Sequence, residues 1–168
     1  MNIYSPYEID MEKLSSVPTE LEIFTHKFVG LPRNIKDIML LTAPGFIWTL
    51  AQNYNLTEEQ SGNISRIIRD ILLGDLFAGD MSQTISERLE LDQQTAQQIR
   101  DKLVKELFAP AIEDIKKIQR EKFPDRVGQG SANTPRPAMP QPPAPPQMKN
   151  GPPVNQSNII NLRQNSNS

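Results

Sequence analysis

The chain has 168 residues, a formal net charge of −2, no cysteine and a single histidine, His26. Without cysteine it has no disulfide, no thiolate nucleophile and no zinc–cysteine site, and one histidine leaves little for triad or metal chemistry. We therefore expect a non-enzymatic protein with no catalytic residue, no metal and no cofactor. Ten of the 15 prolines lie in residues 123–168, which leaves roughly 120 residues for one small folded domain.

Residues 1–17 show no sustained hydrophobic period and contain Pro6, which is typical of an arm. Ile3, Tyr4 and Tyr7 are the residues expected to hold it. The arm carries acids where a signal peptide needs a basic region, so we predict a cytoplasmic protein. The longest apolar stretch, residues 38–51, is shorter than the about 20 residues that span a bilayer, and is therefore assigned to the core with no role in a membrane.

The predicted helical domain covers residues 18–122. Its first helix follows Pro18 and ends at Gly30, although the alternation there leaves a strand open. Two short helices follow, with Pro32 and Pro44 in their first turns, the second running to Tyr54. We expect their inward face to consist of aliphatic side chains and methionine, namely Ile35, Ile38, Met39 and Leu41. Trp48 is assigned to the core, with a ligand or partner groove as the alternative.

The second half of the domain carries clearer helix signals. Residues 57–60 form a capping box, and the helix that follows has one aliphatic stripe that consists of Ile64, Ile67, Ile68, Ile71 and Leu72. Asp80 and Asp92 are expected to cap the next two helices. Pro110 should kink the chain or start a final helix that ends near Lys122, because proline lacks the N–H that the helix ladder needs.

An internal similarity appears when the sequence is shifted by 35 residues. The shift aligns Leu56 and Thr57 with Leu91 and Asp92, and it also aligns the aliphatic positions of the two following helices. Each copy is a short helix, a leucine, a cap and a long helix, a size typical of helical repeats, although chance alignment of two capped helices stays open. The predicted fold is therefore all-α, a compact bundle of six to seven helices built around two similar helix pairs.

Residues 82–103 resemble a helix-turn-helix unit of bacterial regulators. In this interpretation Asp92 caps a recognition helix, and the residues that would face DNA are Gln93, Gln94, Gln97, Gln98 and Arg100. Glu90 stands where that family usually has glycine, and the surrounding region is acidic, which disfavours phosphate binding. Binding of nucleic acid is therefore the alternative function.

The last part of the chain divides into three segments. Residues 123–157 read as a proline-rich, intrinsically disordered spacer, residues 158–163 as a short apolar motif, and residues 164–168 as a disordered end. The motif residues expected to bind a partner are Ile159, Ile160, Leu162 and Arg163. The partner expected for this motif is another protein.

The stretch from Phe46 to Leu76, the LFAP sequence of residues 107–110 and the proline-rich segment followed by IINLR together resemble an uncharacterised helical domain found in small proteins of candidate-phylum bacteria. The resemblance covers about residues 34–118 and the motif. It implies the fold and the arrangement of the tail, but no activity. The function we predict is a protein-interaction or adaptor module tethered to a linear motif, and the alternative is a DNA-binding regulator.

Overall fold

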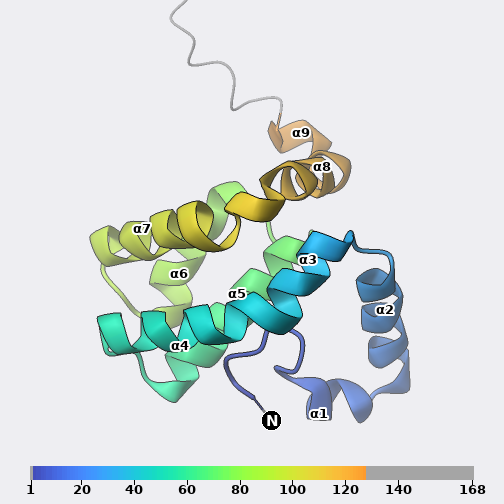
Figure 1. Cartoon of the computed structure of the whole chain (residues 1–168), viewed down its shortest axis with the longest axis horizontal. Coiled ribbons are helices and arrows are strands. Elements are labelled where there is room, and N and C mark those ends of the chain that lie inside the picture. The colour runs from blue at the N-terminus through green and yellow to red at the C-terminus, as the bar shows by residue number, and fades with distance from the viewer. Residues whose placement is uncertain (1, 128–168) are drawn as a thin grey trace, which may run out of the picture. The chain divides into compact units, whose positions relative to one another are not determined.

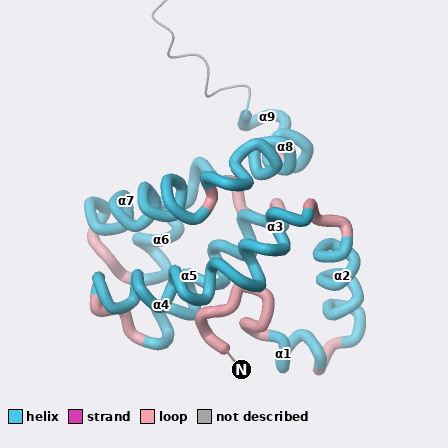
Figure 2. The backbone as a smooth tube through the Cα atoms, in the orientation of Figure 1, coloured by secondary structure: helices cyan, strands magenta, loops and turns pink. Residues whose placement is uncertain are grey.

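In the computed structural model, residues 2–127 are described, and they form an all-α structure without strands (Figure 1 and Figure 2). The predicted fold class is therefore confirmed for this part of the chain. The motif residues 158–163 lie outside the described residues. The helical elements are α1 (Met11–Ser15), α2 (Pro18–Val29), α3 (Arg33–Asp37), η1 (Ile38–Thr42), α4 (Ala43–Tyr54), α5 (Glu58–Leu73), η2 (Ala78–Asp80), α6 (Met81–Leu89), α7 (Gln93–Lys102), η3 (Leu103–Leu107), η4 (Ala109–Ala111), α8 (Ile112–Lys122) and α9 (Pro124–Val127).

The helix α5 is the centre of the packing, with contacts to α4, α6 and α8. Its predicted aliphatic stripe is fully buried, as are three small residues on another side of the helix, Ser61, Gly62 and Ser65. Burial of apolar surface is the main favourable term in folding. A helix that is buried on more than one side must be enclosed by its neighbours, and this determines where the other helices lie.

The N-terminal segment packs along the small residues of α5. Ile9 is buried and would contact a Cβ added at Gly62, and the Ser65 hydroxyl donates to the carbonyl oxygen of Ile3. The Asp10 carboxylate accepts hydrogen bonds from the Arg66 guanidinium at 2.7 and 2.9 Å. The predicted arm is thus a packed segment. Tyr4 and Tyr7 pack against the core as expected, and Ile9 and Asp10, which the sequence pattern did not single out, add further contacts.

Aromatic side chains join this segment to α2. The ring of Tyr7 lies 5.7 Å from that of Phe24 and 4.6 Å from that of Phe28, in tilted arrangements typical of favourable aromatic pairs. Residues 18–29 are helical, so the strand interpretation of this region is wrong. The alternation of Ile23 and Val29 reflects side chains that stay exposed.

Two prolines follow π-helical turns, and their effects differ. In the turn η1 the N–H of Ala43 donates to the carbonyl of Ile38, five residues back, so the ring of Pro44 fits without a break. The helical backbone therefore continues from Arg33 to Tyr54, and the prediction of two separate helices there is wrong. After the turn η3, by contrast, Pro110 lies in a 3₁₀ turn and α8 starts as a new helix, as predicted.

The two predicted helix pairs have the same local geometry. Each first helix ends at a left-handed residue, Asn55 (φ 51°) or Glu90 (φ 54°). The N–H of the leucine that follows donates to the carbonyl five residues back, from Leu56 to Ala51 and from Leu91 to Ser86, as in a Schellman turn. Thr57 and Gln60 form the predicted capping box, and the Asp92 carboxylate accepts from the Thr95 N–H. The 35-residue similarity therefore corresponds to a repeated turn.

The last described helices are fixed by side chains that reach the loop before α6. Buried Gln119 accepts from the N–H of Ala78 and donates to the carbonyls of Ile71 and Leu76. Asp80 is the N-cap residue of α6, as predicted, but its side chain makes no cap hydrogen bond and instead pairs with Arg126 of α9. The ordered structure extends at least to Val127, beyond the boundary placed at residue 122.

The ion pair of Asp10 predicts a pH-dependent contribution to stability. Hydrogen bonding to Arg66 lowers the pKa of Asp10, so the contribution is present above the usual aspartate pKa of about 3.9 and is lost as the pH falls through the lowered folded value. Asp10→Asn keeps a residue that tolerates the left-handed backbone. We expect it to reduce the free energy of unfolding by about 1–2 kcal/mol at neutral pH, measured by urea unfolding.

The difference between the Asp10→Asn variant and the native chain should shrink when the same titration is carried out at pH about 3. Asp75→Asn is the control, because its pair with Lys27 is more exposed and should contribute about 0.5 kcal/mol or less. A difference for Asp10→Asn that is unchanged at low pH would contradict the assigned role of the carboxylate.

Candidate functional site

The outer face of η1 and α4 is the most unusual surface of the described domain. Residues 38–57 contain no charged side chain, although 23% of the whole chain is charged. A helix at the surface of a domain ordinarily carries charged residues on its outer face. Here the inner face is buried as usual, whereas the outer face exposes aliphatic, aromatic and small polar side chains. We call this outer face, centred on Leu41, Gly45 and Trp48, the α4 surface.

Trp48 is 54% exposed and Leu41 is 75% exposed. The assignment of both residues to the core is therefore wrong, and for Trp48 the alternative, a place in a partner surface, is the one compatible with its exposure. The continuous helix explains the error. Because it passes through Pro44 without a break, Leu41 lies one turn before Gly45 and Trp48 one turn after it, on the side opposite buried Ile47.

A pocket of about 330 Å³ adjoins the α4 surface. One wall consists of Gly45, Phe46 and Thr49 of α4, and the other of Lys102 and Glu106 from α7 and η3. A Cβ added at Gly45 would meet no atom within 4 Å. The missing side chain therefore leaves a notch on the outer side of α4, and this open space can receive an apolar side chain of a partner.

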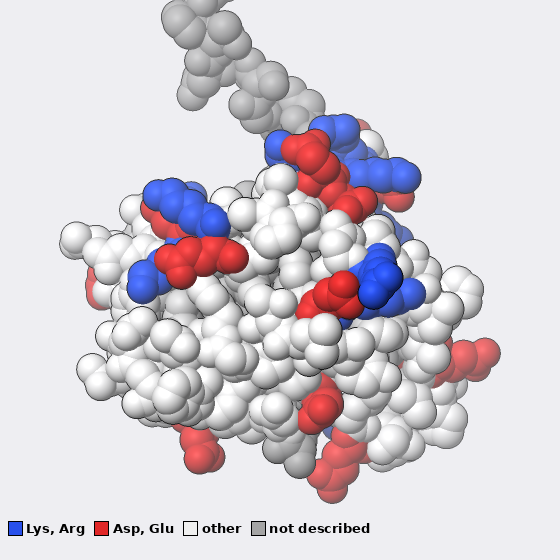
Figure 3. Space-filling view, in the orientation of Figure 1, with Lys and Arg blue, Asp and Glu red and all other residues white. Residues whose placement is uncertain are grey.

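Charged residues surround the α4 surface without entering it. Figure 3 shows a broad uncharged area over α4, with mixed clusters of both signs over α3, α7 and α8. At the edge, Arg33 pairs with Asp37 at 3.8 Å, and Lys102 lies 5.7 Å from the ring of Tyr54. An apolar centre within a polar rim is the usual composition of a protein–protein contact.

The helix-turn-helix stretch has the expected local geometry. The four glutamines Gln93, Gln94, Gln97 and Gln98 are exposed on α7. The Thr95 side chain and backbone N–H donate to the Asp92 carboxylate and lower the pKa of Asp92. Glu90 adopts the left-handed conformation that glycine usually supplies at this turn.

The charges of this unit do not favour phosphate. Residues 82–103 contain four acidic and three basic side chains, and the Arg100 guanidinium donates to Asp101 at 2.6 and 3.0 Å. Arg88 is paired with Asp70. The glutamines can reach a groove, but the excess of acidic over basic side chains in this stretch disfavours the DNA backbone.

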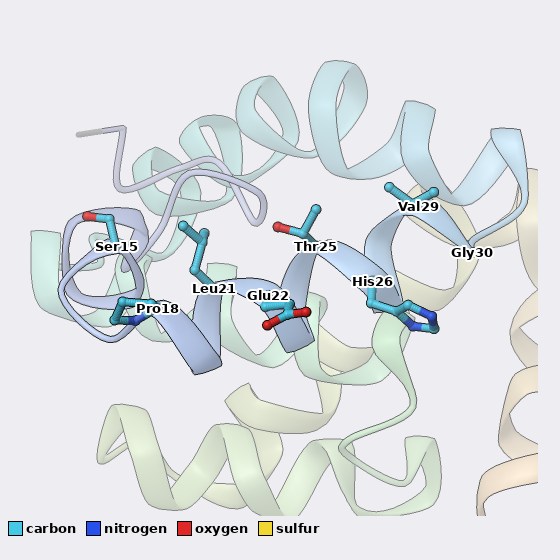
Figure 4. Close-up of a pocket in the computed structure, with 8 residues that line it drawn as sticks. All are labelled: Ser15, Pro18, Leu21, Glu22, Thr25, His26, Val29 and Gly30. Atoms are coloured by element: carbon cyan, nitrogen blue, oxygen red, sulfur yellow. The ribbon is translucent and has the colours of Figure 1, made fainter.

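A larger pocket, of about 680 Å³, lies along α2. Figure 4 shows that its lining comes from the end of α1, from α2 and from Gly30, with Glu22 and His26 as the ionisable members. His26 is exposed. Because the lining comes almost entirely from one helix, the polar groups do not converge as they do at a catalytic centre.

The described residues contain neither a metal-binding cluster nor a membrane-spanning helix. Residues 2–127 contain no group of three or more His, Asp or Glu side chains placed to hold a metal ion. Among the same residues, no helix is both long enough and apolar enough to cross a membrane.

The predicted site residues fall into two groups. The glutamines and Arg100 lie on α7, and Ile159, Ile160, Leu162 and Arg163 lie outside the described residues. Leu41 and Gly45 were not singled out as site residues, and Trp48 was given a partner groove only as the alternative. The 20-residue run without charge was a signal that could have indicated all three.

Comparisons with protein-family models, with curated proteins and with solved structures found no match. The resemblance to a helical domain of candidate-phylum bacteria therefore stays a prediction, and the case for a function depends on the α4 surface.

The notch at Gly45 predicts a gain in stability on substitution. Gly45→Ala should raise the free energy of unfolding by about 0.5–1 kcal/mol, because glycine is unfavourable within a helix and the new methyl group enters open space. Urea unfolding measures this change. Gly62→Ala, where the Cβ would contact Ile9 and Arg66 at 3.6 Å, is the control and should gain less. A loss of stability for Gly45→Ala would contradict the described geometry.

Proposed function

We propose that this protein is a non-enzymatic interaction module that binds another protein through the α4 surface. The single observation that supports the proposal is the exposure of Trp48 and Leu41 within 20 consecutive residues that carry no charge. Exposed apolar residues are common singly, but a contiguous group in a polar rim is typical of an interaction site.

The chemistry of the surface favours a protein partner. Tryptophan is among the residues that contribute most to binding energy at protein interfaces, and the notch at Gly45 can receive one aliphatic side chain. An amphipathic helix with leucine or isoleucine at helical spacing would match a long, narrow apolar strip. Residues 158–163 are the second proposed element, a motif that would bind a further site through Ile159, Ile160, Leu162 and Arg163.

Two elements on one chain would act as an adaptor. The intervening segment, residues 128–157, would set the distance over which the two elements reach their targets. Linking two binding elements raises the effective concentration of the second once the first is bound, so modest individual affinities suffice. The cytoplasmic location expected from the sequence stays part of this proposal.

The test is capture of partners from an extract of the source cells by the full chain, followed by measurement of affinity with the purified partner. Trp48→Ser should weaken binding about 30-fold or more, the effect of losing a 2 kcal/mol contact. The free energy of unfolding should change little, because the side chain is more than half exposed.

Val29→Ser on α2 is the matched control, since Val29 is 66% exposed but lies away from the α4 surface. Deletion of residues 157–168 tests the motif separately and should remove a different partner or lower avidity without changing the melting temperature. Equal binding by the native chain and Trp48→Ser would contradict the proposal.

The DNA-binding alternative is favoured by one observation, the four exposed glutamines that follow a helix-turn-helix turn. It predicts an affinity for duplex DNA that falls steeply with salt. Changing Gln93 and Gln97 to alanine would relax sequence preference in a fluorescence anisotropy titration. From the charge balance we expect no salt-dependent binding, and its detection would favour the alternative.

A further inference from the structure

We propose that the α4 surface pairs with the same surface of a second copy of this chain, forming a two-fold symmetric dimer with antiparallel α4 helices. This inference rests on the proposed function, because it names one occupant of the same surface. Where the dimer forms, a heterologous partner would compete with it for the α4 surface.

The charge distribution is the first support. Residues 1–127 carry 15 basic and 20 acidic side chains, a net charge of −5. A two-fold contact places the same patch of each subunit together, and like charges that meet across a contact weaken it. The α4 surface has no charged residue between positions 38 and 57. Its own residues therefore bring no acid into the contact, and the charged residues across the pocket beside Gly45, Lys102 and Glu106, are of opposite sign.

The spacing of residues along the helix is the second support. Leu41 lies four residues before Gly45 and Trp48 lies three residues after it. With a two-fold axis near Gly45, an antiparallel pair places Leu41 opposite the partner's Trp48, and Trp48 opposite the partner's Leu41. Gly45, whose Cβ direction is open, leaves room for the two helices to approach closely at the axis.

The pattern on α2 is less suited to self-association. Ile23 and Val29 are also exposed, but the same helix carries Glu20, Glu22 and Lys27. A two-fold contact there would bring acidic side chains near their own copies. The α4 surface is favoured because its apolar residues are not interrupted by charge.

The size of the contact sets the expected strength. The helical run of residues 38–54 is about 25 Å long at 1.5 Å per residue, and it is one helix wide. A strip of this size covers less than the about 800 Å² per subunit of a standard interface. The dimer should therefore be weak and dependent on protein concentration. A weak dimer also leaves the surface accessible to a better-matched partner.

Sedimentation velocity of the full chain, from micromolar to near-millimolar concentration, tests the association. The native chain should shift from monomer to dimer, whereas Trp48→Ser and Leu41→Ser should each weaken association about tenfold or more. Val29→Ser should behave as the native chain does. High salt should not weaken the dimer, because the contact contains no ion pair at its centre. Circular dichroism checks that each variant stays folded.

Engineered cysteines test the antiparallel arrangement, because the native chain has none. Gly45→Cys should form a disulfide-linked dimer under mild oxidation, since its two copies lie at the axis within the about 7 Å that a disulfide allows between Cα atoms. Gln52 lies seven residues away on the same face. Its two copies would be about 20 Å apart in an antiparallel pair, so Gln52→Cys should not form the bridge.

The outcomes separate this inference from the proposed function. A chain that stays monomeric at every concentration, or that loses association equally with Val29→Ser, overturns the dimer. Equal bridging by Gly45→Cys and Gln52→Cys overturns the antiparallel arrangement. A monomeric chain that still captures a partner through Trp48 retains the proposed function, whereas a dimer that captures no Trp48-dependent partner retains only this inference.

Discussion

Burial of α5 is the constraint on which the rest of the described structure depends. One side of this helix is aliphatic and another consists of small residues, and both are covered. The aliphatic side is covered by the neighbouring helices. The side with small residues allows the N-terminal segment to pack close to the α5 backbone. Because α4 covers α5 with only its inner face, its outer face remains without a partner in the described domain.

The continuity of α4 with η1 determines which side chains lie together on this outer face. Had Pro44 broken the helix, Leu41 and Trp48 would belong to separate elements with unrelated orientations. The π-helical turn at residues 38–42 accommodates the proline ring, so the two side chains lie on one face at either side of Gly45. The π-helical turn that accommodates Pro44 thus determines the shape of the α4 surface. The absence of charge over the same residues makes that shape suitable for an apolar contact.

Much of the local structure was predictable because it depends on short-range chemistry. The capping box at Thr57 and Gln60, the cap at Asp92 and the break at Pro110 each follow from hydrogen bonds or steric effects within one turn. The all-α class follows from the periodicity of apolar residues. The 35-residue similarity predicted two similar helix pairs, and the structure repeats the turn within them.

The errors arose where long-range packing decides the outcome. The side of the helix that Leu41 and Trp48 occupy depends on the π-helical turn, and periodicity alone does not reveal such a turn. The Asp80 side chain pairs with Arg126 of α9 and makes no cap hydrogen bond to α6. The roles of Asp10 and Gln119 depend on partners more than 40 residues away in the sequence. The same limit applies to the candidate site, because the apolar pattern around Trp48 favoured a core position and the side chain is exposed.

Photo-crosslinking tests the central claim, that the α4 surface is a binding surface, most directly. A photoreactive residue placed at position 48 of the full chain is compared with one at position 23 on α2, which is similarly exposed in the native chain. If α4 carries the binding surface, position 48 should give cross-linked products whose attachment sites lie in apolar segments, and position 23 should give few. Equal yields from both positions, or products from position 23 alone, would contradict it.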